Sequence, residues 1–208
     1  MKEYSVVMSL VDLIPVVLFA ITAIILQRDL YYKMSKGAFA LFSAGTIDII
    51  AAGTLKALYK LLYALKICDF DKLNQMFFPV QSIGFLLAGI AIIAMLVHKQ
   101  EPRVTVMSTA PALFSGTMIF VVCMIAGLGC ITGGLSYIAI KMKKPAAVVL
   151  FIVTFILLLC MGYLSTKDFD KAYMNWMAEI INVAGQTCFL FAARILHKNK
   201  LAEFELNS

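Results

Sequence analysis

The segment YMNWMAEIINVAGQTCFLFAARIL, residues 173–196, is long and apolar enough to cross a bilayer, yet four regularly spaced polar side chains lie between positions 175 and 186. These are Asn175, Glu179, Asn182 and Gln186, spaced so that all four fall within about 60° of one helix face. Water does not reach the core of a bilayer, so this polar stripe must face protein or a wet cavity. The segment therefore predicts a membrane helix that borders a polar interior.

Composition places the rest of the chain in a membrane as well. Of the 208 residues, 62% are hydrophobic and only 14% are charged, and the mean hydropathy is +0.92. Soluble domains do not have such values. Apolar runs of spanning length fall at roughly 5–27, 37–58, 77–97, 112–140, 146–164 and 173–196. We predict an all-α polytopic membrane protein with six transmembrane helices, forming a single transmembrane domain over 1–208 with a polar tail at 199–208.

The basic residues between these runs indicate an orientation. If the six helices alternate in direction, eleven Lys and Arg residues lie on the side of both termini and seven on the opposite side. Cytoplasmic loops are richer in basic residues, so both termini are expected in the cytoplasm, and the expected location is the cell membrane. The first helix is expected to be retained, because residues 1–3 lack the basic region of a signal peptide.

Two further carboxylates lie inside predicted spans. Asp12 lies just before Pro15 in the first helix, where it either serves a function or only caps the chain near a kink. Asp48 lies near the middle of the second helix, where an aspartate costs about 2.5–3.5 kcal/mol on insertion scales. We expect Asp48 to have a functional role or to pair with Lys56, two turns further along the same helix.

Other side chains extend the predicted polar interior. Gln81 follows Pro79 in the third helix and is expected to line its wall. Trp176 and Tyr59 are candidates for aromatic walls against a cation, although Trp176 equally suits an interfacial aromatic belt.

An internal repeat divides the chain into halves. The motif DFDK at 69–72 recurs at 168–171, and the pair His-Lys at 98–99 recurs at 197–198, both at an offset of 99 residues. The motif KMSK at 33–36 likewise resembles KMKK at 141–144. Convergent capping of helix ends is the alternative explanation. A duplication predicts halves at 1–99 and 100–198 with three helices each, and an odd number of helices in alternation makes them inverted repeats.

The fourth apolar run contains four glycines. Gly129 and Gly133 have the spacing of a small-residue packing motif in membrane helices. The alternative is a discontinuous helix whose exposed backbone lines a site.

Several classes of partner are excluded. The net charge of +6 comes from basic residues at helix ends, and no basic patch is interleaved with aromatic residues, so no nucleic acid is expected. The five cysteines form no CxxC motif, and both histidines lie at helix ends. We therefore predict no metal and no cofactor.

Buried carboxylates and amides are typical of coupled transport, because they can hold a proton or a cation. The sequence favours a small transporter, or the membrane-embedded binding subunit of one, with a ligand-binding cavity for a polar or cationic small molecule. An intramembrane lipid-modifying enzyme that uses paired carboxylates is a less favoured alternative, and a ligand sensor is another. A homodimer and a complex with a separate transporter subunit both stay open as assemblies in the lipid bilayer. The predicted binding residues are Glu179, Asn182, Gln186, Asn175, Asp48, Asp12, Gln81, Trp176 and Tyr59.

Overall fold

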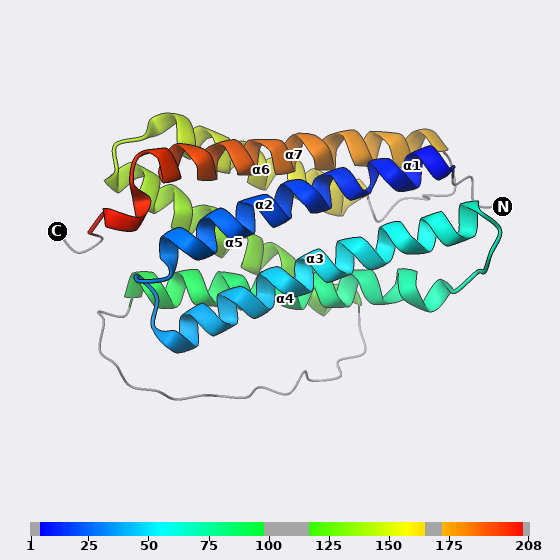
Figure 1. The fold of residues 1–208 in the computed structure, drawn as a ribbon, viewed down its shortest axis with the longest axis horizontal. Helices are drawn as coiled ribbons and strands as arrows, with labels where there is room; N and C mark the ends of the chain where they lie inside the picture. The colour runs from blue at the N-terminus through cyan, green and yellow to red at the C-terminus, as the bar shows by residue number, and fades with distance from the viewer. Residues whose placement is uncertain (1–4, 98–116, 165–171, 206–208) are drawn as a thin grey trace.

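The computed structural model describes residues 5–97, 117–164 and 172–205, and these are helical apart from short turns (Figure 1). The elements are α1 (Val6–Val11), α2 (Leu13–Leu30), α3 (Lys36–Ala64), α4 (Asp71–Val97), α5 (Thr117–Lys141), α6 (Pro145–Leu164), α7 (Ala172–Lys198) and the 3-10 turn η1 (Leu201–Glu203). Five spans are long and apolar enough to cross a membrane: Val6–Leu30, Lys36–Ala64, Lys72–Val97, Ile119–Lys141 and Tyr173–Lys198. Among the described residues, Pro145–Met161 is a shorter apolar helix, so the structure supports an all-α membrane fold with five candidate spanning helices, and a sixth spanning helix stays a prediction.

The first span is interrupted at Asp12, which is the C-cap of α1 and the N-cap of α2. Pro15 follows in the first turn of α2, where its missing N–H removes no hydrogen bond that the helix would otherwise make. Ser5 caps α1 by accepting a hydrogen bond from the Met8 N–H at 3.1 Å. The interruption puts the Asp12 carboxylate on the inner side of the bundle, where it is 5% exposed.

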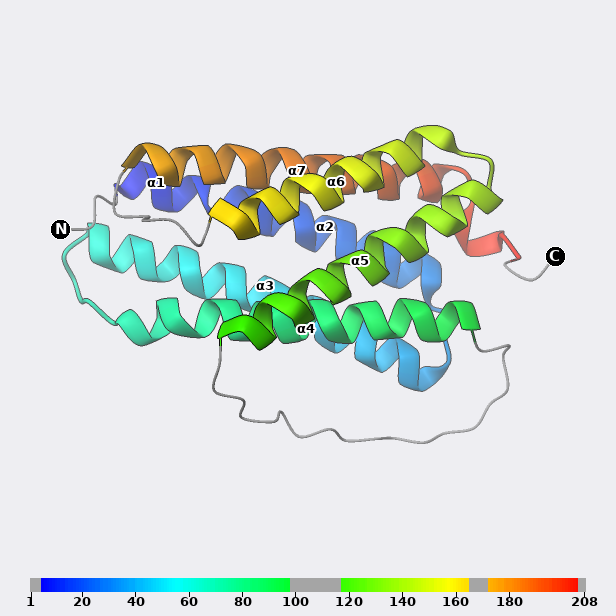
Figure 2. The same ribbon diagram turned by 180° about the vertical axis from the view of Figure 1, so that it is seen from behind.

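The helices α4 and α5 run in the same direction, as Figures 1 and 2 show. A Cβ on Gly127 would collide with the backbone of Phe85, and a Cβ on Gly134 would meet Ile92 seven residues further along α4. Both positions advance together, which happens only between parallel helices. The helices α2 and α7 are parallel as well, because Glu179 lies beside Asp12 and His197 lies beside Asp29.

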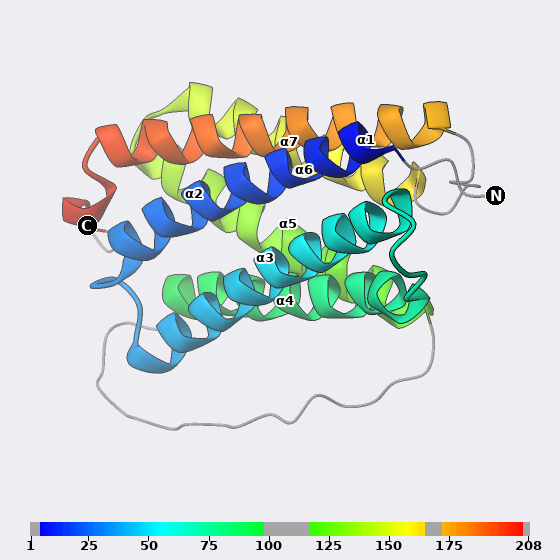
Figure 3. The same ribbon diagram turned by 45° about the vertical axis from the view of Figure 1, so that its right-hand side comes forward.

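These directions correct two expectations from the sequence. The order α2, α3, α4 and the order α5, α6, α7 follow the same sequence of directions, so the three-helix halves are parallel and not inverted. The start of α1 and the end of α7 also lie at opposite ends of the bundle, so the expectation that both termini share a side is wrong for the described helices (Figure 3). Simple alternation failed because α5 begins at Thr117, toward the other end of the bundle from Val97, where α4 ends.

The repeat motifs fit the parallel arrangement where they are described. The turns at 33–36 and 141–144 both lie at the end of the bundle where α2, α5 and α7 finish, which we call the closed end. The opposite end, where α1 begins, we call the cavity end. For each of the other two motif pairs, one copy lies outside the described residues. These copies are residues 98–99 and residues 168–171.

The helices form a ring in the order α2, α3, α4, α5, α6, α7, and α7 returns to α2. Small residues allow the closest approaches, such as Gly45 against Gly84 between α3 and α4. Gly129 and Gly133 do not make such contacts, since a Cβ on Gly133 would meet nothing within 4 Å. A Cβ on Gly129 would make only ordinary contact with Phe155 of α6, and Gly127 and Gly134 are the glycines that bring α5 against α4.

The closed end is filled by a continuous apolar core. Leu30, Leu135, Ile138 and Leu196 are all completely buried there. Toward the middle of the bundle, Phe19 packs against Phe85 and Phe189 with ring centroids 6.3 and 6.2 Å apart, and Phe151 packs against Phe189 at 6.0 Å. These rings separate the apolar half of the bundle from the half toward the cavity end.

The chain after α7 folds back over the closed end. Leu201 in η1 is fully buried, and the Lys33 ammonium donates a hydrogen bond to the Phe204 carbonyl. Partial burial lowers the pKa of Lys33, and the nearby Glu205 and Asp29 carboxylates oppose that shift. The His197 ring contacts the buried Asp29 carboxylate, with Nδ1 at 2.9 Å from Oδ2. Polar contacts between α2 and the end of α7 thus seal this side of the bundle.

Candidate functional site

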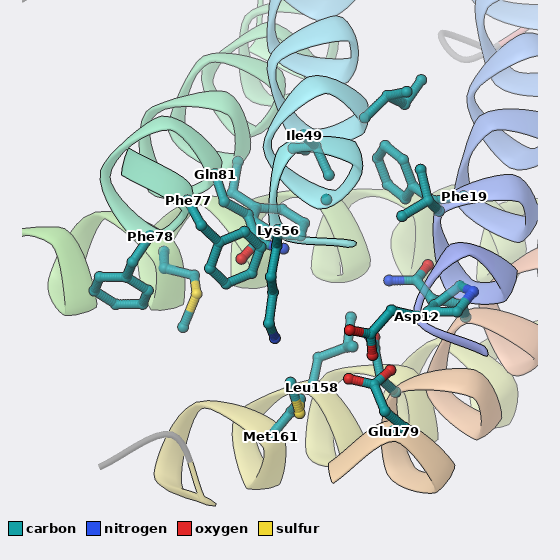
Figure 4. Close-up of a pocket in the computed structure, with 18 of the residues that line it drawn as sticks. Asp12, Phe19, Ile49, Lys56, Phe77, Phe78, Gln81, Leu158, Met161 and Glu179 are labelled. Carbon is teal, nitrogen blue, oxygen red and sulfur yellow. The ribbon is translucent and has the colours of Figure 1, made fainter. Parts of the chain in front are cut away.

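A cavity of about 600 Å³ occupies the half of the bundle toward the cavity end (Figure 4). Side chains from all the long helices line it, and Phe19, Phe85 and Leu128 form its floor toward the middle of the bundle. Its polar lining residues are Asp12, Lys56, Lys60, Asn74, Gln81, Asn175, Glu179, Asn182 and Gln186. The wall therefore combines a group of charged and amide side chains with an apolar floor.

Three charged residues from three helical segments meet on one wall. The Lys60 Nζ of α3 lies 2.7 Å from Asp12 Oδ2 and 3.5 Å from Glu179 Oε1 of α7. All three side chains are at most 4% exposed, and we call them the charge cluster. Buried charges are tolerated only when they are paired, so each residue depends on the other two to keep its charge inside the membrane.

The two carboxyl groups of the charge cluster point toward one another (Figure 4). Lys60 supplies one positive charge against two carboxylates. Asp12 Oδ1 and Glu179 Oε2 are buried and accept no hydrogen bond from any described residue, and neither does the amide oxygen of Gln186 further along α7. A buried acceptor without a donor is costly, and three of them border one space.

Lys56 extends into the cavity from α3, across from the Asp12 and Glu179 carboxyl groups (Figure 4). Its ammonium lies 4.6 Å from the centroid of the Phe77 ring on α4, within the range of a cation–π contact. Within residues 5–97, 117–164 and 172–205, Lys56 forms no ion pair. The cavity thus holds Lys60, which is paired with both carboxylates, and Lys56, whose ammonium contacts the Phe77 ring and lies within electrostatic range of Asp12 and Glu179 without an ion pair among the described residues.

The structure brings six of the nine predicted binding residues to this cavity. Every member of the polar stripe lines it, together with Asp12 and Gln81: the six are Asn175, Glu179, Asn182, Gln186, Asp12 and Gln81. The helical periodicity of α7 was thus sufficient to place the stripe on one wall. Whether these side chains bind a solute stays a prediction.

The other three predicted residues lie elsewhere. Asp48 is half-buried with its Cβ beside Gly84 of α4, and it is not part of the cavity lining. It does not pair with Lys56, because eight helical residues separate them by about 12 Å along the axis. Trp176 is 36% exposed on the outer face of α7. Tyr59 is buried, and its hydroxyl donates to Asp69 Oδ1 at 3.2 Å.

The sequence interpretation missed the role of the two lysines. Lys56 was considered only as a possible partner of Asp48, and Lys60 was given no role in the interior, but α3 continues to Ala64 and keeps both inside the span. Three intramembrane carboxylates require counter-ions, and that requirement was the available signal. Lys60 proved to be the counter-ion of Asp12 and Glu179.

Among the residues that the structure describes, no three His, Cys, Asp or Glu side chains are grouped in a way that could hold a metal ion. Comparison with known proteins adds no assignment, because no protein family, no curated protein and no solved structure matches the chain.

Proposed function

We propose that this protein is a small membrane transporter, or the membrane-embedded binding subunit of one, for a polar small molecule. The observation that carries the proposal is the cavity of about 600 Å³ with the charge cluster on its wall, opposite a half of the bundle that is densely packed. A binding space that is present in one half and absent from the other is what an alternating-access protein presents in one of its two states.

The directions of the helices support this proposal. Parallel three-helix halves, related by an axis along the membrane normal, occur in secondary transporters with the site between the halves. Here α4 packs on α5, and α7 packs on α2, so the two contacts between the halves are equivalent. Movement of one half against the other at these two contacts would open the closed end and close the cavity end.

The basic residues support an orientation for the bundle. Nine described Lys and Arg residues lie at the closed end: Arg28, Lys33, Lys36, Lys141, Lys143, Lys144, Arg194, Lys198 and Lys200. Four lie toward the cavity end, namely Lys56, Lys60, Lys66 and Lys72, and the first two of these are inside the bundle. The positive-inside rule therefore places the closed end in the cytoplasm and has the cavity in the opposite half.

The charge cluster is the proposed means of coupling. Asp12 and Glu179 share one ion-pair partner, Lys60, so a proton or an ammonium group of the solute can bind at the carboxyl pair. Because both would occupy the same carboxyl pair, the solute and the proton would compete. Competition of this kind links solute movement to a proton gradient.

The approach of Asp12 and Glu179 also favours a second function, an intramembrane enzyme with paired carboxylates as acid and base. Asp48 does not join them, and Lys60 neutralises part of their charge, so the pair has the features of a binding site more than of a reaction centre. A transporter and an enzyme differ in one physical respect: only the transporter must expose the packed half of the bundle.

Site-directed labelling tests this difference without knowledge of the solute. In a background in which the five native cysteines are replaced, single cysteines at Val16 in the cavity and at Ala192 in the packed half would be treated with a membrane-impermeant maleimide from either side of a vesicle. We expect Val16→Cys to react from the cavity end and Ala192→Cys to react more slowly from the closed end. A variant that retains only Cys68, which is exposed at the cavity end, reports the sidedness of the vesicles. Complete protection of Ala192→Cys would contradict the proposal.

A further inference from the structure

Two walls of the cavity carry polar groups that lack a partner of the complementary kind among the described residues. One wall has hydrogen-bond acceptors, and the other has an ammonium group. On one wall are the acceptors Asp12 Oδ1, Glu179 Oε2 and the Gln186 amide oxygen, all buried and without a donor among the residues that the structure describes. On the other is the Lys56 ammonium, held over the Phe77 ring and without an ion pair among the described residues. One wall needs N–H donors, and the other needs an anion.

The charges of the cavity balance one another. Asp12 and Glu179 contribute two negative charges, while Lys56 and Lys60 contribute two positive charges. A purely cationic or anionic solute would leave a net charge inside the membrane span, which is unfavourable in a medium of low dielectric constant. A solute with one charge of each sign preserves neutrality and satisfies both walls.

The remaining lining of the cavity is apolar. Phe77, Phe78, Met124, Leu158 and Met161 surround the space between the charged walls, together with the phenylalanines of its floor. Binding an apolar body here removes hydrocarbon surface from water, while the few polar groups fix its orientation.

We propose that the cavity takes a zwitterion with an apolar body, whose ammonium group lies against Asp12 and Glu179 and whose anionic group lies against Lys56. The proposal rests on the proposed function, because it assumes that the cavity is a solute site. Lys60 remains in place beside Asp12 Oδ2, and the ammonium of the solute donates to the carboxylate oxygens that Lys60 does not reach. The volume of about 600 Å³ lies within the range of sites for drug-sized ligands, so a short apolar peptide is a suitable probe.

Three probes of similar size test the contributions of the ammonium and the carboxylate of the solute separately. The dipeptide Leu-Leu is a zwitterion, its C-terminal amide keeps only the ammonium, and its N-acetyl derivative keeps only the carboxylate. Binding to the purified full chain would be measured by calorimetry in detergent. We expect Leu-Leu to bind at least about tenfold more tightly than either derivative, since a hydrogen-bonded charge pair contributes about that factor.

Two substitutions assign the two ends of the probe. Lys56→Met keeps the contact with Phe77 and removes the charge, so Leu-Leu should bind it no better than the amide does, while the affinity of the amide should not change. Glu179→Gln should weaken both the zwitterion and the amide. Lys72→Met, at an exposed lysine of the same end, is the matched control and should leave all three affinities unchanged. Retention of a single monodisperse peak in size-exclusion chromatography shows that each variant is folded.

Several outcomes would overturn the inference. Equal affinity for Leu-Leu and the amide indicates a site for cations, equal affinity for the N-acetyl derivative indicates a site for anions, and no binding of any probe excludes apolar zwitterions of this size. Exposure of Ala192→Cys at the closed end is measured separately. A protein that passes the labelling test and fails the probe test is therefore a transporter for a different solute, whereas failure of both removes the proposed function.

Discussion

Lys60 and Asp12 form an ion pair with 2.7 Å between Nζ and Oδ2, although both lie inside helices long enough to cross a membrane. Glu179 completes the group from α7, and the three residues connect the first span, α3 and α7. The charge cluster thus joins helices from both halves of the chain at the wall of the cavity. Its position explains why these costly residues can be buried together.

Removal of Lys60 should be strongly destabilising. Lys60→Met leaves two buried carboxylates without a counter-ion, and breaking a buried pair in this way costs about 3–5 kcal/mol. We expect a lower midpoint of thermal unfolding in detergent, followed by intrinsic fluorescence. The double variant Lys60→Met with Glu179→Gln should recover part of the loss, because one of the two carboxylates is neutralised with its partner.

Lys66→Met serves as the control for that comparison, since Lys66 is exposed just beyond the end of α3. It should unfold at the same temperature as the unmodified chain. If Lys60→Met matched it, the ion pair would have no role in stability.

A disulfide should form between α4 and α5 if the two helices are parallel. The Cβ that Gly134 would carry lies 3.7 Å from the Ile92 Cβ, within the usual range for a disulfide. In a background free of other cysteines, the variant with cysteines at 92 and 134 should cross-link on mild oxidation. The control pair at 92 and 127 is separated by seven further helical residues, about 10 Å, and should not cross-link. The reverse result would restore the antiparallel arrangement that an inverted repeat requires.

The close approach of α4 and α5 should tolerate no side chain at Gly127. A Cβ there would collide with the Phe85 backbone, so Gly127→Ala must move the helices apart, at a cost of about 1–3 kcal/mol. Gly133→Ala on the same helix adds a Cβ in open space and is the matched control. Equal unfolding temperatures for the two variants would show that the predicted contact is absent.

Individual helices and their polar faces were predictable from the sequence, but their mutual directions were not. The polar stripe on α7 follows from the helical period alone, and it reached the cavity as its spacing indicates. Asp48 is also an acidic residue inside a span, but α3 turns it toward Gly84 and away from the cavity, which depends on how α3 rotates against α4. Lys60 could be assigned only once Asp12 and Glu179 were known to lie on neighbouring helices.

The directions of the helices in the second half could not be predicted from the sequence, for a similar reason. Alternation of helices across a membrane assumes that consecutive helices run in opposite directions, and α4 and α5 run in the same direction. Sequence similarity between 33–36 and 141–144 was visible in advance, and both turns lie at the closed end. Sequence similarity between two turns therefore does not reveal whether the helices around them run parallel or inverted.

The contact between Asp29 and His197 should hold the closed end together. Asp29→Asn keeps the size of the side chain and removes the charge that faces the His197 ring. If the closed end opens during transport, this change should increase the labelling rate of Ala192→Cys from that side several-fold. Lys198→Met, next to His197 but exposed, should have no such effect. An unchanged rate in Asp29→Asn would mean that the contact does not control opening.

In the proposed transport cycle, the two halves move and expose the cavity alternately at the two ends of the bundle. The most direct measurement is the distance across the closed end between spin labels on Lys36 and Lys143, which lie in the equivalent turns of the two halves. Pulsed electron paramagnetic resonance in lipid nanodiscs should give two populations, one matching the closed end described here and one with a longer distance. The longer population should grow in the Asp29→Asn variant. A single distance that is the same in both proteins would contradict the account and leave the cavity as a fixed binding site.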